Sequence, residues 1–173
     1  MKMIYLDNAA TTMIDAEVLS VMHEASLENF GNPSSTHQFG RKAKSAIETA
    51  RKNIAKRFNV SASEIIFTSG GTEADNLILQ NAVFNLGVQR IITSKIEHHA
   101  VLHTCEFLEK THEIQLDFVQ LDVHGNIDLY HLETLLAASD KKTLISLMLI
   151  NNEIGNLLST DAVCELSDKY HAL

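Results

Sequence analysis

The fold of this chain is decided by the stretch IIFTSGGTEADN, residues 65–76. Its apolar, β-favouring start ends at Thr68, two glycines follow, and a helical pattern then begins. We therefore predict a strand over residues 64–68, a tight turn and a helix. Adjacent glycines let a backbone turn sharply and approach a ligand without Cβ clashes, and a helix start offers unpaired N–H groups and a positive dipole. This corner predicts a phosphate site, although a plain turn capped by Thr72 explains the local sequence equally well.

The sequence narrows the class of phosphate ligand. No Gly-Lys-Ser/Thr follows the glycine pair, so the Walker pattern is absent. The dinucleotide pattern G-x-G-x-x-G is absent as well. A nucleotide is therefore not the favoured ligand.

Composition predicts one globular domain that binds neither nucleic acid nor membrane. The chain has 173 residues, of which 45% are hydrophobic, and this is enough for a core. Its net charge of -8 disfavours nucleic acid and anionic membranes as partners. The basic residues between Arg41 and Arg57 lie around a helix with an apolar face, which favours a solvated helix surface over a nucleic-acid site.

The cysteine content and the start of the chain predict a cytoplasmic protein. No secretory signal is visible, and no apolar run approaches the ~20 residues that a membrane-spanning helix needs. Cys105 and Cys164 fit a reducing compartment, with both thiols free. Each lies on an apolar helical face, so we expect both to serve in packing.

Strand and helix patterns alternate along the chain. Besides residues 64–68, strands are predicted at residues 90–94, 114–118 and 143–150. Helices are predicted from the 3.6-residue spacing of apolar side chains at residues 15–29, 43–58, 74–82, 101–108, 129–136 and 163–170. This order predicts an α/β fold, a three-layer αβα arrangement with a mostly parallel sheet. The chain stops just after a predicted helix, so we expect the architecture to be truncated there.

Polar side chains follow two of the predicted strands. Glu97 and His98 come after the strand at residues 90–94, and residues 151–153, Asn-Asn-Glu, come after the longest apolar run. The carboxyl edge of a parallel sheet is where such folds bind ligands. The ring of His98 can stack on a flat ligand or move protons near neutral pH, and a solvated loop histidine is the alternative.

A metal site is the weaker interpretation of the histidines. His99 and His103 are four residues apart and share a helical face. No third ligand is evident, and no glutamate lies between them as in H-E-x-x-H. We therefore predict no metal ligands.

Five motifs in order resemble a known family. They are YLDNAATT at residues 5–12, GNPSS at 31–35 followed by His37, TSGGTEADN at 68–76, EH at 97–98 and NNEIG at 151–155. Together these motifs resemble cysteine desulfurases of the NifS/IscS type, which are class-V aminotransferases among the fold-type I pyridoxal-phosphate enzymes. The resemblance spans nearly the whole chain and is far more specific than a lone glycine pattern.

The resemblance implies an activity and its partners. Such enzymes convert L-cysteine to L-alanine and an enzyme-bound persulfide, whose sulfur enters iron–sulfur cluster assembly or tRNA thiolation. It implies a homodimer, a sulfur-acceptor protein and an incomplete large domain. Residues 1–14 are expected to form an extended segment in which Asn8 and Ala9 border the substrate site. Residues 15–173 are expected to form part of the cofactor-binding domain.

The resemblance also implies cofactor-binding residues. Gly71 and Thr72 are expected to hold the phosphate of pyridoxal 5'-phosphate, in agreement with the glycine turn. His98 is expected to stack on the pyridine ring and to take part in proton transfer. Asn152 is expected to contact the cofactor near its ring oxygen and to help orient the substrate.

Three segments expected from the resemblance are not present in the 173 residues. They carry the Schiff-base lysine in Ser-x-His-Lys, the sulfur-accepting cysteine, and the aspartate that pairs with the pyridinium nitrogen in His-x-Asp-Ala. Lys95, Cys105 and Cys164 lie in the wrong positions to replace them. We therefore expect this chain alone to be inactive and to bind the cofactor weakly or not at all. The alternatives are a fragment of another class-V aminotransferase or of a selenocysteine lyase, and a non-catalytic, partner-binding pseudo-enzyme.

Overall fold

A computed structural model describes residues 3–173. The chain forms two compact units that divide between Phe67 and Thr68. The first unit contains helices only. The second contains a parallel sheet with helices on both faces.

The first unit consists of α1 (Ala16–Glu28), α2 (Gln38–Phe58) and the short 3-10 helix η1 (Ala62–Glu64). Helix α1 begins where its predicted range does, and Asp15 caps it: the Asp15 carboxylate accepts a hydrogen bond from the Glu17 N–H at 2.8 Å. Both predicted helices form. Their apolar faces, however, are largely exposed, and the unit's buried residues are small ones on α2: Gly40, Ala43 and Ala55.

A close approach of the chain explains one glycine of the first unit. A Cβ atom on Gly40 would lie 2.4 Å from the carbonyl oxygen of Ser35 and 2.6 Å from that of Asn32. Any side chain here would force the backbone apart. The loop at residues 31–35 therefore packs directly on the first turn of α2.

The predicted strand at residues 64–68 does not form. The backbone of Ile65 is extended, with φ -92° and ψ 118°, but the run pairs with no other strand among residues 3–173. Its carbonyl accepts a hydrogen bond from Arg51, whose guanidinium lies 4.7 Å from the ring centre of Phe67. An extended run becomes a strand only when a neighbouring strand supplies a ladder of hydrogen bonds, and here a side chain takes that place.

The sheet of the second unit contains β1 (Arg90–Ser94), β2 (Gln115–Val119) and β3 (Thr143–Ser146) in the order β2-β1-β3. Both pairings are parallel, and Arg90 lies opposite Gln115 on one side and Thr143 on the other. Parallel neighbours require crossover connections, which the intervening helices supply. The predicted α/β class with a parallel sheet is confirmed.

Strand β3 is half as long as the predicted run at residues 143–150. Its last pairing joins Ser146 to Thr93, and β1 ends one residue later. The chain then leaves the sheet, and Ile150 forms an isolated antiparallel bridge with Leu157. Apolar character predicted the length of the run, but the partner strand limits how much of it can pair.

Helices α3 (Gly71–Phe84) and α4 (His99–His112) cover one face of the sheet. Ile91 and Leu108 are fully buried between them and the strands. This cluster also contains Leu79, Ala82, Val88, Val101, Cys105 and Ile114. One apolar layer therefore holds the second half of α3 and the inner face of α4 against the sheet.

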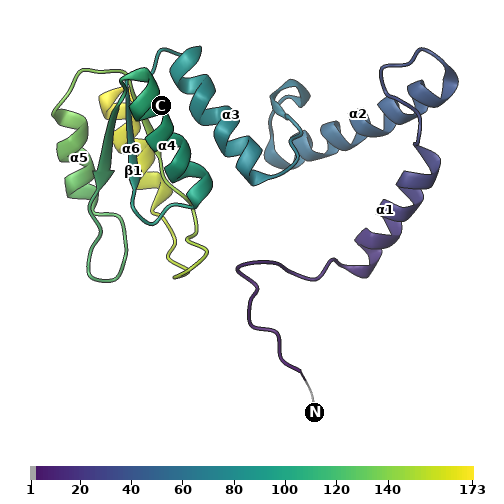
Figure 1. Ribbon diagram of the computed structural model, residues 1–173, viewed down its shortest axis with the longest axis horizontal. Coiled ribbons are helices and arrows are strands. Elements are labelled where there is room, and N and C mark those ends of the chain that lie inside the picture. The colour runs from purple at the N-terminus through teal and green to yellow at the C-terminus, as the bar shows by residue number, and fades with distance from the viewer. Residues whose placement is uncertain (1–2) are drawn as a thin grey trace. The chain divides into compact units, whose positions relative to one another are not determined.

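Helices α5 (Leu129–Ala137) and α6 (Thr160–Tyr170) cover the opposite face. Ile92 and Leu132 are fully buried there, together with Val119 and Leu136. Figure 1 shows α4 and α5 on opposite sides of β1, which makes the unit a three-layer αβα structure. Among the described residues, no helix combines the length and the apolar character needed to cross a membrane.

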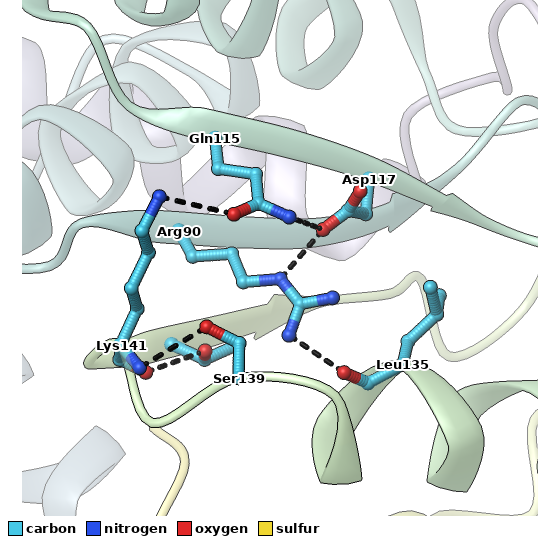
Figure 2. Close-up of polar contacts among 7 residues, drawn as sticks. Arg90, Gln115, Asp117, Leu135, Ser139 and Lys141 are labelled. Atoms are coloured by element: carbon cyan, nitrogen blue, oxygen red, sulfur yellow. Dashed lines mark hydrogen bonds and ion pairs between the residues drawn. The ribbon is translucent and has the colours of Figure 1, made fainter.

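A buried charge lies at the amino end of β1. Arg90 is 1% exposed, and Figure 2 shows its guanidinium between Asp117 and the carbonyl of Leu135. Its Nε donates to Asp117 Oδ2 at 2.5 Å and its Nη1 to the Leu135 carbonyl at 2.6 Å. Gln115 donates to the same carboxylate oxygen at 2.8 Å. The arginine thus ties β1, β2 and the last turn of α5 together, at the edge opposite the polar loops.

Candidate functional site

The carboxylate of Glu73 holds the turn before α3 together through hydrogen bonds from Ser69. Glu73 Oε2 accepts hydrogen bonds from the backbone N–H and the hydroxyl of Ser69, both at 2.6 Å. These bonds hold the pKa of Glu73 below its usual value, so the side chain stays ionised. The first helical bond runs from the Ala74 N–H to the Gly70 carbonyl. The N–H groups of Gly71 and Thr72 precede it and are the unpaired donors that a helix start leaves for a ligand.

Among residues 3–173, no packing contact requires the two glycines of this turn. Gly70 has an extended backbone, with φ 168° and ψ 179°, which any residue can adopt. A Cβ atom on Gly70 or Gly71 would meet no atom within 4 Å. The sharp turn expected from the sequence therefore does not explain the glycines. Their effect is to leave the backbone N–H groups open to an approaching ligand.

His98 is the first residue of the neighbouring helix start. It is the N-cap of α4, and its Nδ1 accepts a hydrogen bond from the Ala100 N–H at 3.1 Å. Because Nδ1 is the acceptor, the neutral ring carries its proton on Nε2. The imidazole is exposed, so one ring nitrogen stabilises the helix while the other stays available to a ligand.

A groove lies between the starts of α3 and α4. It encloses about 450 Å³, within the range of small-molecule sites. Thr72 and His98 both line it, as do Asn76, His99, Ala100, His103, Thr104 and Phe107. Thr72 and His98, two of the predicted cofactor residues, therefore line one groove although they are 26 residues apart in the sequence.

Asn76 joins the two helices that form the groove. Its Nδ2 donates to the Thr72 carbonyl at 2.8 Å, and its Oδ1 accepts from the Thr104 hydroxyl at 2.7 Å. Thr104 is buried on α4. The amide thus fixes the first turn of α3 against the body of α4.

Of the other predicted site residues, Asn152 belongs to the second unit, and Asn8 and Ala9 belong to the first. Asn152 is exposed in the loop after β3, where its Nδ2 donates to Glu153 Oε1 at 2.8 Å. Asn8 and Ala9 are exposed in a turn of the first unit, in which the N–H of Ala10 donates to the carbonyl of Asp7. Their expected roles at the substrate and cofactor stay predictions.

Glu97 is a buried acid directly beside His98. It is 7% exposed, and its Oε1 accepts a hydrogen bond from the Ser94 hydroxyl at 2.7 Å. Burial raises the pKa of its carboxyl, while hydrogen bonds from Ser94 and from the backbone of Met148 oppose that rise. The negative charge of Asp75 also raises the pKa of Glu97. The net pKa lies above the ordinary value of 4.5.

The raised pKa of Glu97 predicts a pH-dependent stability. Between the unfolded and folded pKa values the folded chain binds more protons, so the unfolding free energy falls as pH rises through that window. Replacing Glu97 by glutamine is expected to flatten this fall. Urea unfolding between about pH 5 and pH 8 measures it. Glu109→Gln, at an exposed position on α4, is the control, and an unchanged slope in Glu97→Gln would contradict the assignment.

The two histidines considered for a metal are stacked on α4. The rings of His99 and His103 lie 5.1 Å apart between centroids, with an interplanar angle of 26°. Within residues 3–173, no group of three or more His, Cys, Asp or Glu side chains could hold a metal ion. In the structure these rings line the groove with Thr72 and His98.

The two cysteines differ in their surroundings. Cys105 is fully buried on the inner face of α4, as predicted, and burial raises its pKa to about 12. The charges of Glu97 and Glu106 contribute to that rise. Cys164 is exposed on α6, so the prediction that it serves in packing is wrong. The apolar side chains that face the sheet are Val163 and Leu166, and Cys164 lies about 100° around the helix from Val163, so its assignment to the apolar face was wrong.

The sequence did not identify the hydrogen bonds that hold the candidate site together. Asn151 is 4% exposed and lies beside the exposed Asn152, yet both appeared as equivalent amides after an apolar strand. Asn76 belongs to the TSGGTEADN motif, for which a role in helix packing is expected, but nothing in the sequence indicated Thr104 as its partner. Their hydrogen bond joins residues 28 apart, and no local pattern encodes it.

Comparisons with known proteins agree with the motif order. Residues 4–173 match the family Aminotransferase class-V. The chain is 44% identical over 170 residues to "Cysteine desulfurase IscS" of Dictyoglomus turgidum, covering 96% of this chain and 42% of that protein. It is 43% identical over 175 residues to "Putative cysteine desulfurase IscS 1" of Bacillus subtilis, covering 99% and 45%. The chain thus spans less than half the length of these relatives.

Solved structures show the same fold. A NifS-like protein superposes with a TM-score of 0.86 at 38% identity, covering 94% of this chain and 44% of that one. The structure "SspA in complex with cysteine" superposes with a TM-score of 0.86 at 31% identity, covering 95% and 47%. The three-layer unit is therefore similar to part of the large domain of fold-type I enzymes.

Proposed function

Because the chain belongs to the class-V aminotransferase family, we propose that it is part of a pyridoxal-phosphate-dependent cysteine desulfurase. The single observation that supports this most is the groove shared by Thr72 and His98. It brings an open helix start and an available imidazole together, which is what a phosphorylated aromatic cofactor requires. The order of the five sequence motifs narrows the cofactor to pyridoxal 5'-phosphate.

The residues present fit that cofactor. The open N–H groups of Gly71 and Thr72, with the Thr72 hydroxyl, would hold its phosphate, because no Cβ atom or packed side chain obstructs the turn. The ring of His98 would lie against the pyridine ring, since Nδ1 is bound to the helix start and the ring is exposed. Asn152 would contribute its amide near the ring oxygen and the substrate.

The chemistry divides between the cofactor and the side chains. When bound, pyridoxal phosphate supplies the electron sink for carbanion chemistry at the substrate Cα. His98 would hold or move a proton at Nε2, the nitrogen that is not committed to Ala100. Asn152 would orient the substrate, with Asn8 and Ala9 bordering it. The histidines and Phe107 along α4 would shield the groove from water on one side.

A pair of matched threonine variants tests cofactor binding. Thr72→Val removes the hydroxyl expected to bind the phosphate and is expected to weaken binding of pyridoxal phosphate about tenfold, the value of one charge-assisted hydrogen bond. Thr111→Val, at the far end of α4, removes a hydroxyl that bonds only within its helix and should leave affinity unchanged. Fluorescence titration measures both. Equal affinities for the two variants would contradict a phosphate site at Thr72.

The 173-residue chain is expected to release no sulfide from L-cysteine. It contains none of the family segments that carry the Schiff-base lysine and the sulfur-accepting cysteine. Incubation with L-cysteine and pyridoxal phosphate, followed by assays for sulfide and alanine, measures this. Production of alanine above a protein-free control would contradict the proposed inactivity.

The substrate and partners follow from the same proposal. L-Cysteine is the substrate, a separate protein accepts the sulfur, and the protein is a homodimer in a reducing cytoplasm. The exposed apolar faces of α1 and α2 support association with another surface, because residues 3–67 bury no large side chain of their own. The unpaired thiols of Cys105 and Cys164 fit the reducing compartment.

A further inference from the structure

Two loops of the second unit carry the proposed ligand residues. The loop between β1 and α4 carries His98, and the loop after β3 carries Asn152. The two loops are in contact at Ile96 and Asn151, which are 55 residues apart in the sequence. The interaction that fixes this contact therefore sets the distance between the imidazole of His98 and the amide of Asn152.

The side chain of Asn151 makes that contact. It is 4% exposed, and its Nδ2 donates to the carbonyl oxygen of Ile96 at 2.8 Å. Its Oδ1 accepts from the N–H groups of Glu153 at 2.9 Å and Ile154 at 3.0 Å. The Nδ2 end of the amide therefore binds the neighbouring loop. The Oδ1 end binds backbone N–H groups of its own loop, on the carboxyl side of Asn152.

The backbone of Asn151 closes the same loop. Its N–H donates to the Asn156 carbonyl at 3.0 Å, and its carbonyl accepts from the Gly155 N–H at 2.9 Å. The side chain of Asn156 in turn donates to the carbonyl of His124 at 2.7 Å and to Asn126 at 2.9 Å. The loop that carries Asn152 is thus a closed turn. The Asn151 amide joins it to the loop that carries His98, alongside the hydrogen bond from the Met148 backbone to the Glu97 carboxylate.

The partner loop is also fixed. Glu97 follows Ile96 and is bonded to Ser94 at the end of β1, while Ala100 fixes the ring of His98. Glu97, Asn151 and Asn156 surround a cavity of about 30 Å³, which has room for one or two water molecules. Because both loops are fixed on their own sides, the Asn151 amide acts together with the Met148–Glu97 hydrogen bond to set their relative position, and the amide is the link next to Asn152.

We propose that Asn151 is a positioning residue that holds His98 and Asn152 at the spacing that the cofactor requires. The inference rests on the proposed function, since that function assigns both residues to the cofactor. An asparagine suits the role because it donates at one end and accepts at the other. An aspartate of the same shape accepts at both ends, so it would keep the bonds to Glu153 and Ile154 but repel the carbonyl of Ile96.

Asn151→Asp isolates the bond between the loops, and Asn156→Asp is the matched control. The control introduces the same charge in the same loop but disrupts contacts with His124 and Asn126 only. Two properties are measured on each chain: the exchange rate of the Ala100 amide, which is bonded to His98, and the affinity for pyridoxal phosphate. Asn151→Ser, which is too short to reach Ile96, provides a second variant if the aspartate prevents folding.

We expect faster exchange at Ala100 and about tenfold weaker cofactor binding in Asn151→Asp, with smaller changes in Asn156→Asp. Unchanged exchange at Ala100 in both Asn151 variants would overturn the proposal. Equal losses of affinity in Asn151→Asp and Asn156→Asp would overturn it as well, because charge alone would then explain them. If the unaltered chain binds no cofactor, that result counts against a cofactor site at Thr72 and His98, and exchange at Ala100 alone then decides whether Asn151 fixes the contact between the loops.

Discussion

Replacing Arg90 by alanine is expected to destabilise the second unit by about 3–5 kcal/mol, the usual cost of removing one partner from a buried ion pair. The guanidinium is 1% exposed and bonds both Asp117 and the carbonyl of Leu135. Its loss leaves the carboxylate without its cation and the last turn of α5 without a donor. The gap left by the side chain adds a packing cost.

Chemical denaturation of the purified chain measures this loss. Lys169→Ala is the control, because its ion pair with Glu133 is exposed and is expected to contribute about 0–1 kcal/mol. The double variant Arg90→Met with Asp117→Leu removes both charges and is expected to recover most of the stability. A loss in Arg90→Ala no larger than that in Lys169→Ala would contradict the role of the buried pair.

Cys164 is expected to react with a thiol reagent at least about a thousand times faster than Cys105 in the native chain. The pKa of about 12 leaves about one Cys105 thiol in ten thousand ionised near pH 8, and the thiolate is the reactive form. Cys105 is also 0% exposed, so a reagent reaches it only when α4 opens. Cys164 lies exposed on α6, so a reagent reaches it without any opening of the helix.

Stopped-flow labelling followed by mass spectrometry assigns the rates to each cysteine. Cys164→Ser is expected to abolish the fast phase, and urea is expected to make both sites react. Similar native rates at the two sites would contradict the buried position of Cys105. The expected result also excludes Cys105 as a readily available sulfur acceptor, since that role requires a nucleophilic thiolate.

Local patterns predicted the helices better than the strands. Asp15 and His98 occupy cap positions, and an apolar residue every three or four positions predicted the helices. Residues 64–68 have strand-like composition, but strand identity depends on a partner that no local pattern specifies. Residues 147–150 differ from β3 for the same reason: they extend past the end of β1.

The candidate site was predictable only in part. The glycine turn and His98 could be predicted because helix starts and the carboxyl ends of strands are local features. The Asn76–Thr104 and Asn151–Ile96 contacts could not, because each joins distant residues through one hydrogen bond. The two glycines of the turn illustrate the difference. Their presence was evident in the sequence, but only the structure shows that a Cβ atom on either would meet no atom of the described residues within 4 Å.

The most direct test of the account compares pyridoxal phosphate with pyridoxal, which lacks the phosphate. Backbone amide resonances of the 173-residue chain are followed by NMR during titration with each compound. The account predicts that pyridoxal phosphate shifts the amides of Gly71 and Thr72 together with the resonances of His98, and that pyridoxal binds more weakly without shifting Gly71 and Thr72. Shifts confined to other parts of the chain, or equal shifts at Gly71 and Thr72 with both compounds, would contradict a phosphate site at this turn.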